Sequence, residues 1–83
     1  MPITLDDIRT RILRALPDAE VRVKDTTGGG DHFAATVVTS AFDGLGLLER
    51  HRLVYAALGD AMKADIHALA LTTETPKEQG KTK

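Results

Sequence analysis

The fold is decided by residues 32–73, HFAATVVTSAFDGLGLLERHRLVYAALGDAMKADIHALALTT. Residues 32–39 are rich in Val, Thr and Phe, which favours a strand. A helix from about Leu47 to Ala61 follows, and residues 66–73 return to the two-residue period of a strand. Two strands joined by a crossover helix in one sheet run parallel. We therefore expect the starts of both strands to lie at the same end of the sheet.

The predicted crossover helix carries one line of apolar and aromatic residues at helical spacing. Its members are Leu48, His51, Tyr55, Leu58 and Met62. Such a line is typical of the face that packs on a core. We therefore expect it to face the sheet and His51 to be a partly buried structural histidine.

The chain before residue 32 adds one helix and one strand. Thr4 can cap a helix whose apolar residues recur at spacings of three and four until Pro17 stops it. Residues 19–24 alternate between apolar and charged side chains, as a half-buried strand does. A glycine-rich connector, residues 26–31, then leads into the next strand as an antiparallel hairpin.

These segments predict a small α/β (α+β) domain with the order α-β-β-α-β. We expect a three-stranded mixed sheet with the helices packed on one face. The domain should span residues 1–76, and residues 77–83 should form a flexible polar tail.

The composition of the chain argues against several classes of function. The 83 residues include no cysteine, so the chain has neither a thiol nucleophile nor a thiolate metal ligand. No convincing base and nucleophile set is present, and a domain this small has little room for an enclosed active site, so we do not expect an enzyme. The N-terminus has no apolar run of signal-peptide length and no segment is long enough to span a bilayer, so we expect a cytoplasmic protein without a membrane partner.

Two histidines are candidate metal ligands. His32 begins one predicted strand, His67 begins the strand parallel to it, and Asp31 lies beside His32. Two neutral imidazoles beside an aspartate supply half of a coordination sphere for a borderline or iron-type metal, with the other ligands left to a partner. The alternative is that each histidine only makes structural hydrogen bonds, as lone histidines commonly do.

Arg50 and Arg52 are candidates for contact with a partner. Residues two positions apart on a helix point in directions that differ by about 200°, so the side chains of Arg50 and Arg52 cannot both serve one contact. Arg50 is the better candidate for partner binding, and a packing role remains the alternative.

The spacing of four short motifs resembles the BolA-like family from about Thr4 to Pro76. The motifs are Phe42-Asp43-Gly44, Arg50-His51-Arg52, Ile66-His67-Ala68-Leu69 and Thr73-Glu74-Thr75-Pro76. The resemblance implies a KH-like fold and a monothiol glutaredoxin as partner, with glutathione and a shared [2Fe-2S] cluster. It makes His67 a cluster ligand. The second ligand is a loop Cys or His in this family, and here Asp31 and His32 occupy that region.

The same resemblance leaves a second function open. Some BolA-like proteins are described as transcriptional regulators of stress and morphology genes, which would make Arg50 and Arg52 DNA contacts. The net charge of −1 argues against strong DNA binding, because affinity for DNA is built on cations at phosphates. We expect the isolated chain to be a monomer without a bound cofactor. A plain interaction module whose histidines bind nothing is the third possibility.

Overall fold

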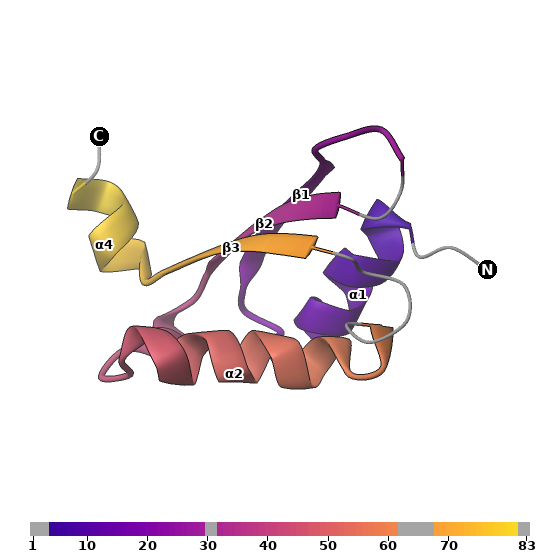
Figure 1. The fold of residues 1–83 in the computed structure, drawn as a ribbon. Helices are drawn as coiled ribbons and strands as arrows, with labels where there is room; N and C mark the ends of the chain where they lie inside the picture. The colour runs from indigo at the N-terminus through magenta and orange to yellow at the C-terminus, as the bar shows by residue number, and fades with distance from the viewer. Residues whose placement is uncertain (1–3, 30–31, 62–67, 82–83) are drawn as a thin grey trace.

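The computed structural model describes residues 4–29, 32–61 and 68–81. Its elements, in chain order, are α1 (Leu5–Ala15), β1 (Glu20–Asp25), β2 (His32–Val38), the 3-10 turn η1 (Ser40–Phe42), α2 (Leu47–Leu58), β3 (Ala68–Glu74) and α4 (Pro76–Lys81). Figure 1 shows the strands as one layer, α1 and α2 against the same face of it, and α4 beyond the end of β3. The predicted α+β class and the order α-β-β-α-β are confirmed, with η1 and α4 in addition.

Helix α1 begins at the predicted cap. Thr4 Oγ1 accepts a hydrogen bond from the Asp7 amide at 3.0 Å, and Asp7 Oδ2 accepts one from the Thr4 amide at 3.1 Å. This reciprocal pair satisfies two backbone donors that the first turn would otherwise leave open. Ile8 and Ile12, one turn apart, are fully buried, and the helix ends before Pro17.

The sheet has the order β1-β2-β3. Strands β1 and β2 are antiparallel, and β2 and β3 are parallel, with His32 opposite Ala68 at one end of the pair and Val38 opposite Glu74 at the other. Phe33 and Val37 of β2 point into the core, as alternation along a strand requires. The parallel arrangement predicted for these two strands is confirmed.

The prediction of which residues of α2 face the core is partly wrong. Leu48 and Tyr55 are 63% and 39% exposed, whereas Val54 and Leu58 are fully buried. Met62 lies outside the described residues. The buried line passes from Leu58 through Val54 to Arg50, and the charge of Arg50 at its first position concealed this line in the sequence pattern.

The ordered chain continues beyond Pro76, where the sequence pattern predicted it to end. Residues Pro76–Lys81 form helix α4, and Thr75 and Glu78 cap its first turn. Proline at the first position of a helix costs no hydrogen bond, because the amide there has no helical partner in any case. Among the described residues, no helix is both long enough and apolar enough to cross a membrane.

Leu58 and Leu48 offer a matched test of which face of α2 carries the core. Leu58→Ala should lower the free energy of unfolding by about 2–5 kcal/mol, because it opens a cavity at a fully buried site. Leu48→Ala removes the same atoms from an exposed site and should change it by less than about 0.5 kcal/mol. Urea denaturation of the two variants measures both values. Equal losses would contradict this assignment of the helix faces.

Candidate functional site

The end of β1 and the starts of β2 and β3 lie at the same end of the sheet. Asp25, the last residue of β1, lies opposite Phe33, and His32 lies opposite Ala68. The His32 side chain is half-buried. Ala68 directly follows His67 in the sequence, so the parallel register sets His32 opposite the neighbour of the second candidate histidine.

The loop after β1 is tied to the backbone of His32. The amide and the hydroxyl of Thr26 both donate to the His32 carbonyl, at 3.0 and 3.2 Å. Asp25 Oδ1 accepts hydrogen bonds from the amides of Thr27 and Gly28, at 3.1 and 2.8 Å. Gly28 has a φ of +79°, a conformation that residues with a Cβ rarely adopt. These bonds fix the backbone from which the His32 side chain leaves.

Two of the three predicted metal ligands, His67 and Asp31, lie outside the described residues. Over residues 4–29, 32–61 and 68–81, no three His, Cys, Asp or Glu side chains come together as a metal site. The structure therefore positions His32 and leaves the three-residue ligand set a prediction.

Arg50 is part-buried where α2, β3 and α4 meet. Its Nε donates to the Leu45 carbonyl at 2.9 Å, and its Nη1 to the Thr73 carbonyl at 3.5 Å. Nη1 and Nη2 donate to the two carboxylate oxygens of Glu78, at 2.6 and 3.1 Å. The guanidinium carbon lies 5.8 Å from the centre of the Phe42 ring. The side chain is only 12% exposed. Its guanidinium nitrogens donate mainly to groups of the same chain, so much of its hydrogen-bonding capacity stabilises the fold.

Glu78 is the residue in this network that sequence reasoning missed. Besides its pair with Arg50, its Oε1 accepts from the Thr75 amide at 2.9 Å, and its own amide donates to Thr75 Oγ1 at 3.1 Å. The Arg50 hydrogen bonds, followed by the Thr75 amide, lower the pKa of Glu78 from 4.5 to about 2. The pattern Thr75-x-x-Glu78 is a capping-box signature and could have predicted this helix start.

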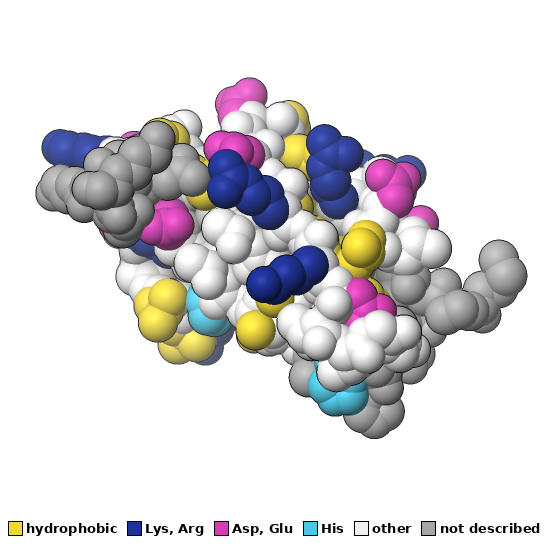
Figure 2. Space-filling model, turned by 90° about the horizontal axis from the view of Figure 1, so that it is seen from above, with side chains coloured by type: hydrophobic (Ala, Val, Ile, Leu, Met, Phe, Trp, Pro, Cys, Tyr) yellow, Lys and Arg dark blue, Asp and Glu magenta, His cyan; other side chains and the backbone are white. Residues whose placement is uncertain are grey.

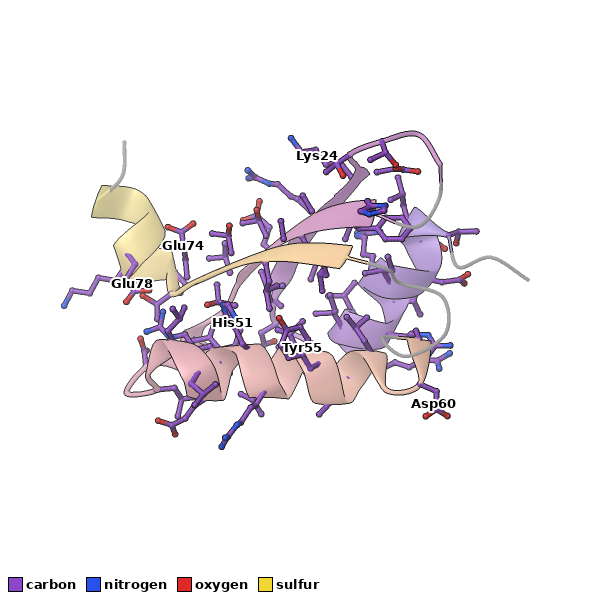
Figure 3. All side chains as sticks on the ribbon, viewed as in Figure 1. Lys24, His51, Tyr55, Asp60, Glu74 and Glu78 are labelled. Atoms are coloured by element: carbon purple, nitrogen blue, oxygen red, sulfur yellow. The ribbon has the colours of Figure 1, made fainter. Side chains whose placement is uncertain are left out.

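Arg52 and His51 differ from Arg50 in their surroundings. Arg52 is exposed on α2, so the two arginines differ in environment as their helical spacing predicts. His51 is half-buried, as predicted, with its ring edge-on to Tyr55 at 6.1 Å between centroids. Figure 3 shows both rings rising from α2 toward β3. His51 Nε2 is buried and has no hydrogen-bond partner among the residues that the structure describes.

Comparisons with known proteins agree on one family. The sequence model described as BolA-like protein matches residues 10–78. BolA-like protein 1 of Pongo abelii is 38% identical over 80 residues, which cover 88% of this chain and 58% of that protein. Protein BOLA2 of Arabidopsis thaliana is 38% identical over 78 residues, covering 92% of this chain and 83% of that one. The chain thus spans little more than half the length of the first of these relatives.

Solved structures give the same result. A bolA protein homologue from Coxiella burnetii has a TM-score of 0.78 and 44% identity, covering 94% of this chain and 97% of that one. The BolA domain of SufE1 from Arabidopsis thaliana has a TM-score of 0.80 and 35% identity over 89% and 93% of the two chains. Yeast Fra2 has a TM-score of 0.77 and 34% identity over 98% and 88%.

The pair formed by Arg50 and Glu78 predicts a pH dependence that a Glu78→Gln variant isolates. At neutral pH the variant should unfold at a lower temperature than the wild type, because the charged carboxylate is lost. A carboxylate with a lowered pKa stabilises the fold above its ordinary value of 4.5, and this stabilisation is lost as the pH falls to about 2. The difference in melting temperature should therefore shrink between these two pH values.

Glu20→Gln is the matched control for this prediction. Glu20 pairs with Arg22 at the same 2.6 Å distance, but the two side chains are 53% and 67% exposed. Exposed pairs of this kind contribute little to stability, so the control should differ less from the wild type than Glu78→Gln does. Identical melting curves for the two variants at every pH would contradict a special role for Glu78.

Proposed function

The chain belongs to the BolA-like protein family, and from that premise we propose that it is an adaptor of iron-sulfur metabolism. In this proposal it binds a monothiol glutaredoxin with glutathione and supplies histidine ligands to a bridging [2Fe-2S] cluster. Its role would lie in cluster trafficking or iron regulation, and it would catalyse no reaction itself.

The observation that carries the proposal is the parallel register of β2 and β3. His32 lies opposite Ala68, and Ala68 follows His67, the residue that the family resemblance makes a ligand. The bonds from Thr26 hold the backbone of His32 at this edge. A ligand whose backbone is already held loses less conformational freedom when it binds, which supports a role for His32 beside His67.

The chemistry of these side chains suits a shared cluster. Iron-sulfur clusters accept imidazole in place of thiolate on one iron, which raises the reduction potential. This chain has no cysteine, so any thiolate ligand must come from the glutaredoxin or from glutathione. A bound cluster would supply electron or iron-sulfur transfer chemistry, while His67, His32 and Asp31 would hold it in this chain.

DNA binding by a transcriptional regulator is the second candidate, and the charges support it less. Arg50 is engaged with Glu78 and two carbonyls, which leaves Arg52 as the exposed arginine of the pair. Figure 2 shows basic and acidic side chains interspersed over the face opposite α2, without one basic patch. Non-specific DNA affinity depends on several cations placed on phosphates, so we expect weak binding that added salt removes.

The cluster proposal predicts a colour that depends on the partner. The isolated chain should be colourless, and co-expression with a monothiol glutaredoxin should give a brown complex with a visible absorption spectrum. His67→Ala should abolish or change that spectrum while the far-ultraviolet circular dichroism stays the same. His51→Ala is the control, because it removes an imidazole of α2 to which the proposal gives no ligand role. Equal spectral loss in both variants would reject His67 as a specific ligand.

The second ligand of this chain is tested by His32→Ala and Asp31→Ala in the same complex. We expect His32→Ala to weaken the cluster spectrum less than His67→Ala does. The family resemblance assigns a ligand role to His67 directly, whereas it gives the second position only to a loop Cys or His. A loss confined to Asp31→Ala would assign the second position to the carboxylate. Wild-type spectra for both variants would show that this chain supplies only one ligand.

A further inference from the structure

Three N–H donors converge on one carboxylate where α4 meets the rest of the domain. Glu78 Oε1 accepts from Arg50 Nη1 at 2.6 Å and from the Thr75 amide at 2.9 Å, and Glu78 Oε2 accepts from Arg50 Nη2 at 3.1 Å. The planar fork of a guanidinium matches the two oxygens of a carboxylate. We call these donors of Arg50 and Thr75 the Arg50 cradle, and its geometry suits a carboxylate.

The Arg50 cradle is held in place by residues outside α4. Arg50 Nε donates to the Leu45 carbonyl, and the guanidinium lies over the fully buried ring of Phe42. Thr75 directly follows β3 and is only 3% exposed. Because the contacts with Leu45 and Phe42 do not involve α4, the guanidinium should keep its position when α4 moves away. A site that is already ordered loses little conformational freedom when it binds a ligand.

Helix α4, which supplies the carboxylate, is short and exposed. It has six residues, and Pro76, Lys77 and Glu78, the α4 residues whose exposure the structure describes, are all exposed. Figure 1 shows the helix beyond the end of β3. Helices of this length are not stable alone in water, and segments with little buried surface open locally while the core stays folded. We therefore expect α4 to undock reversibly from an otherwise intact domain.

We propose that the Arg50 cradle binds an aspartate or glutamate side chain of a partner protein, which takes the place of Glu78 when α4 undocks. In the free chain, Glu78 fills the cradle and keeps the part-buried guanidinium paired. An unpaired charge at such a site costs free energy, so a carboxylate from outside is bound when Glu78 leaves. The exchange keeps the charge of Arg50 paired in both states.

The tether of Glu78 favours a protein over a small free acid as the second occupant. Glu78 lies only three residues after Thr75, so its carboxylate is present at the cradle at a high effective concentration. A small acid makes no further contact with which to overcome this competition. A partner protein adds contacts outside the cradle, and the largely exposed Leu47 lies one turn before Arg50 on α2. An acidic residue beside apolar ones is therefore the chemistry that fits.

The Arg50 cradle and the candidate cluster ligands lie at opposite ends of the sheet. Arg50 donates to the Thr73 carbonyl near the end of β3, whereas His32 lies opposite Ala68, where β3 begins. The proposal therefore does not rest on the proposed cluster function. It adds a second partner surface, which leaves the end of the sheet with the candidate ligands uncovered.

Nuclear magnetic resonance of the full-length Glu78→Ala variant tests the cradle, with sodium acetate as the probe. The Thr75 amide and the Arg50 Nε–H group should shift along a saturating curve, with half-saturation on the order of 100 mM, because a single ion pair in water is weak. Sodium chloride at equal ionic strength should not reproduce the curve. In the wild type, where Glu78 fills the cradle, the same acetate concentration should shift these resonances at least about fivefold less.

Glu20→Ala is the matched control, because it frees Arg22 from an exposed pair with the same 2.6 Å distance. Acetate should shift the Arg22 Nε–H group no more than chloride does, since this side chain is 67% exposed. Adding Arg50→Lys to Glu78→Ala should remove the saturating shift of Thr75, because lysine lacks the planar fork. Circular dichroism establishes that each variant is folded, and Glu78→Gln replaces Glu78→Ala if that variant unfolds.

Displacement by a protein carboxylate is tested on the wild type with a random copolymer of glutamate and tyrosine, matched to acetate in carboxylate concentration. The copolymer makes several contacts at once, so it should shift the Thr75 amide where acetate does not. The Glu78 amide should also exchange with deuterium at least about 100-fold faster than the amides of β2.

Chloride-like, linear shifts in Glu78→Ala would overturn the proposal, and so would equal acetate binding at Arg22 in Glu20→Ala. A wild type that does not respond to the copolymer would show that α4 keeps the cradle closed to other carboxylates and would overturn it as well. A Glu78 amide as protected as those of β2 would have the same consequence.

Discussion

The parallel pairing of β2 with β3 is the constraint on which the rest of the structure depends. Parallel neighbours cannot be joined by a tight turn, so the chain must cross over the sheet, and α2 forms that crossover. The crossover lays α2 on the face where α1 also packs, and Val54 and Leu58 complete the core there. The same pairing sets His32 opposite Ala68 at one end of the sheet and leaves β3 as an edge strand.

At the opposite end of the sheet, the structure depends on one charged side chain. Arg50 replaces an apolar residue on the buried line of α2 and joins Leu45, Thr73 and Glu78 by hydrogen bonds. Covering a guanidinium costs free energy unless its donors are paired, and here two carbonyls and a carboxylate pair the donors of the part-buried Arg50. The two ends of the sheet therefore differ in chemistry, with the candidate ligands at one and a charged structural junction at the other.

Most of the fold could be predicted from local patterns. The cap formed by Thr4 and Asp7 predicted the start of α1, and the alternation of apolar and polar residues predicted the strands. The order of the elements required β2 and β3 to be parallel. The buried face of α2 could not be read from hydrophobicity, because Arg50 lies on that face and two leucines, Leu47 and Leu48, lie off it. Periodicity reports which residues are apolar, and only the tertiary contacts decide which of them are covered.

The candidate site was predictable to a smaller extent. The edge shared by β2 and β3 followed from topology, and His32 was placed there correctly. The partner of Arg50 did not follow, because Glu78 is 28 residues away in the sequence and lies in a segment too polar to suggest packing. The ligand roles of His67 and Asp31 rest on the family resemblance and on chemistry, since neither residue lies in the described part of the chain.

The central claim is that histidine nitrogen from this chain binds a cluster shared with a glutaredoxin. Pulsed electron paramagnetic resonance of the reduced complex tests it most directly, with nitrogen-15 introduced only into the histidines of this chain. The account predicts nitrogen-15 hyperfine couplings of a directly bound imidazole, which are unchanged in His51→Ala, while His67→Ala loses the couplings of the His67 ring. A reduced cluster without any coupling to the labelled histidines would contradict it.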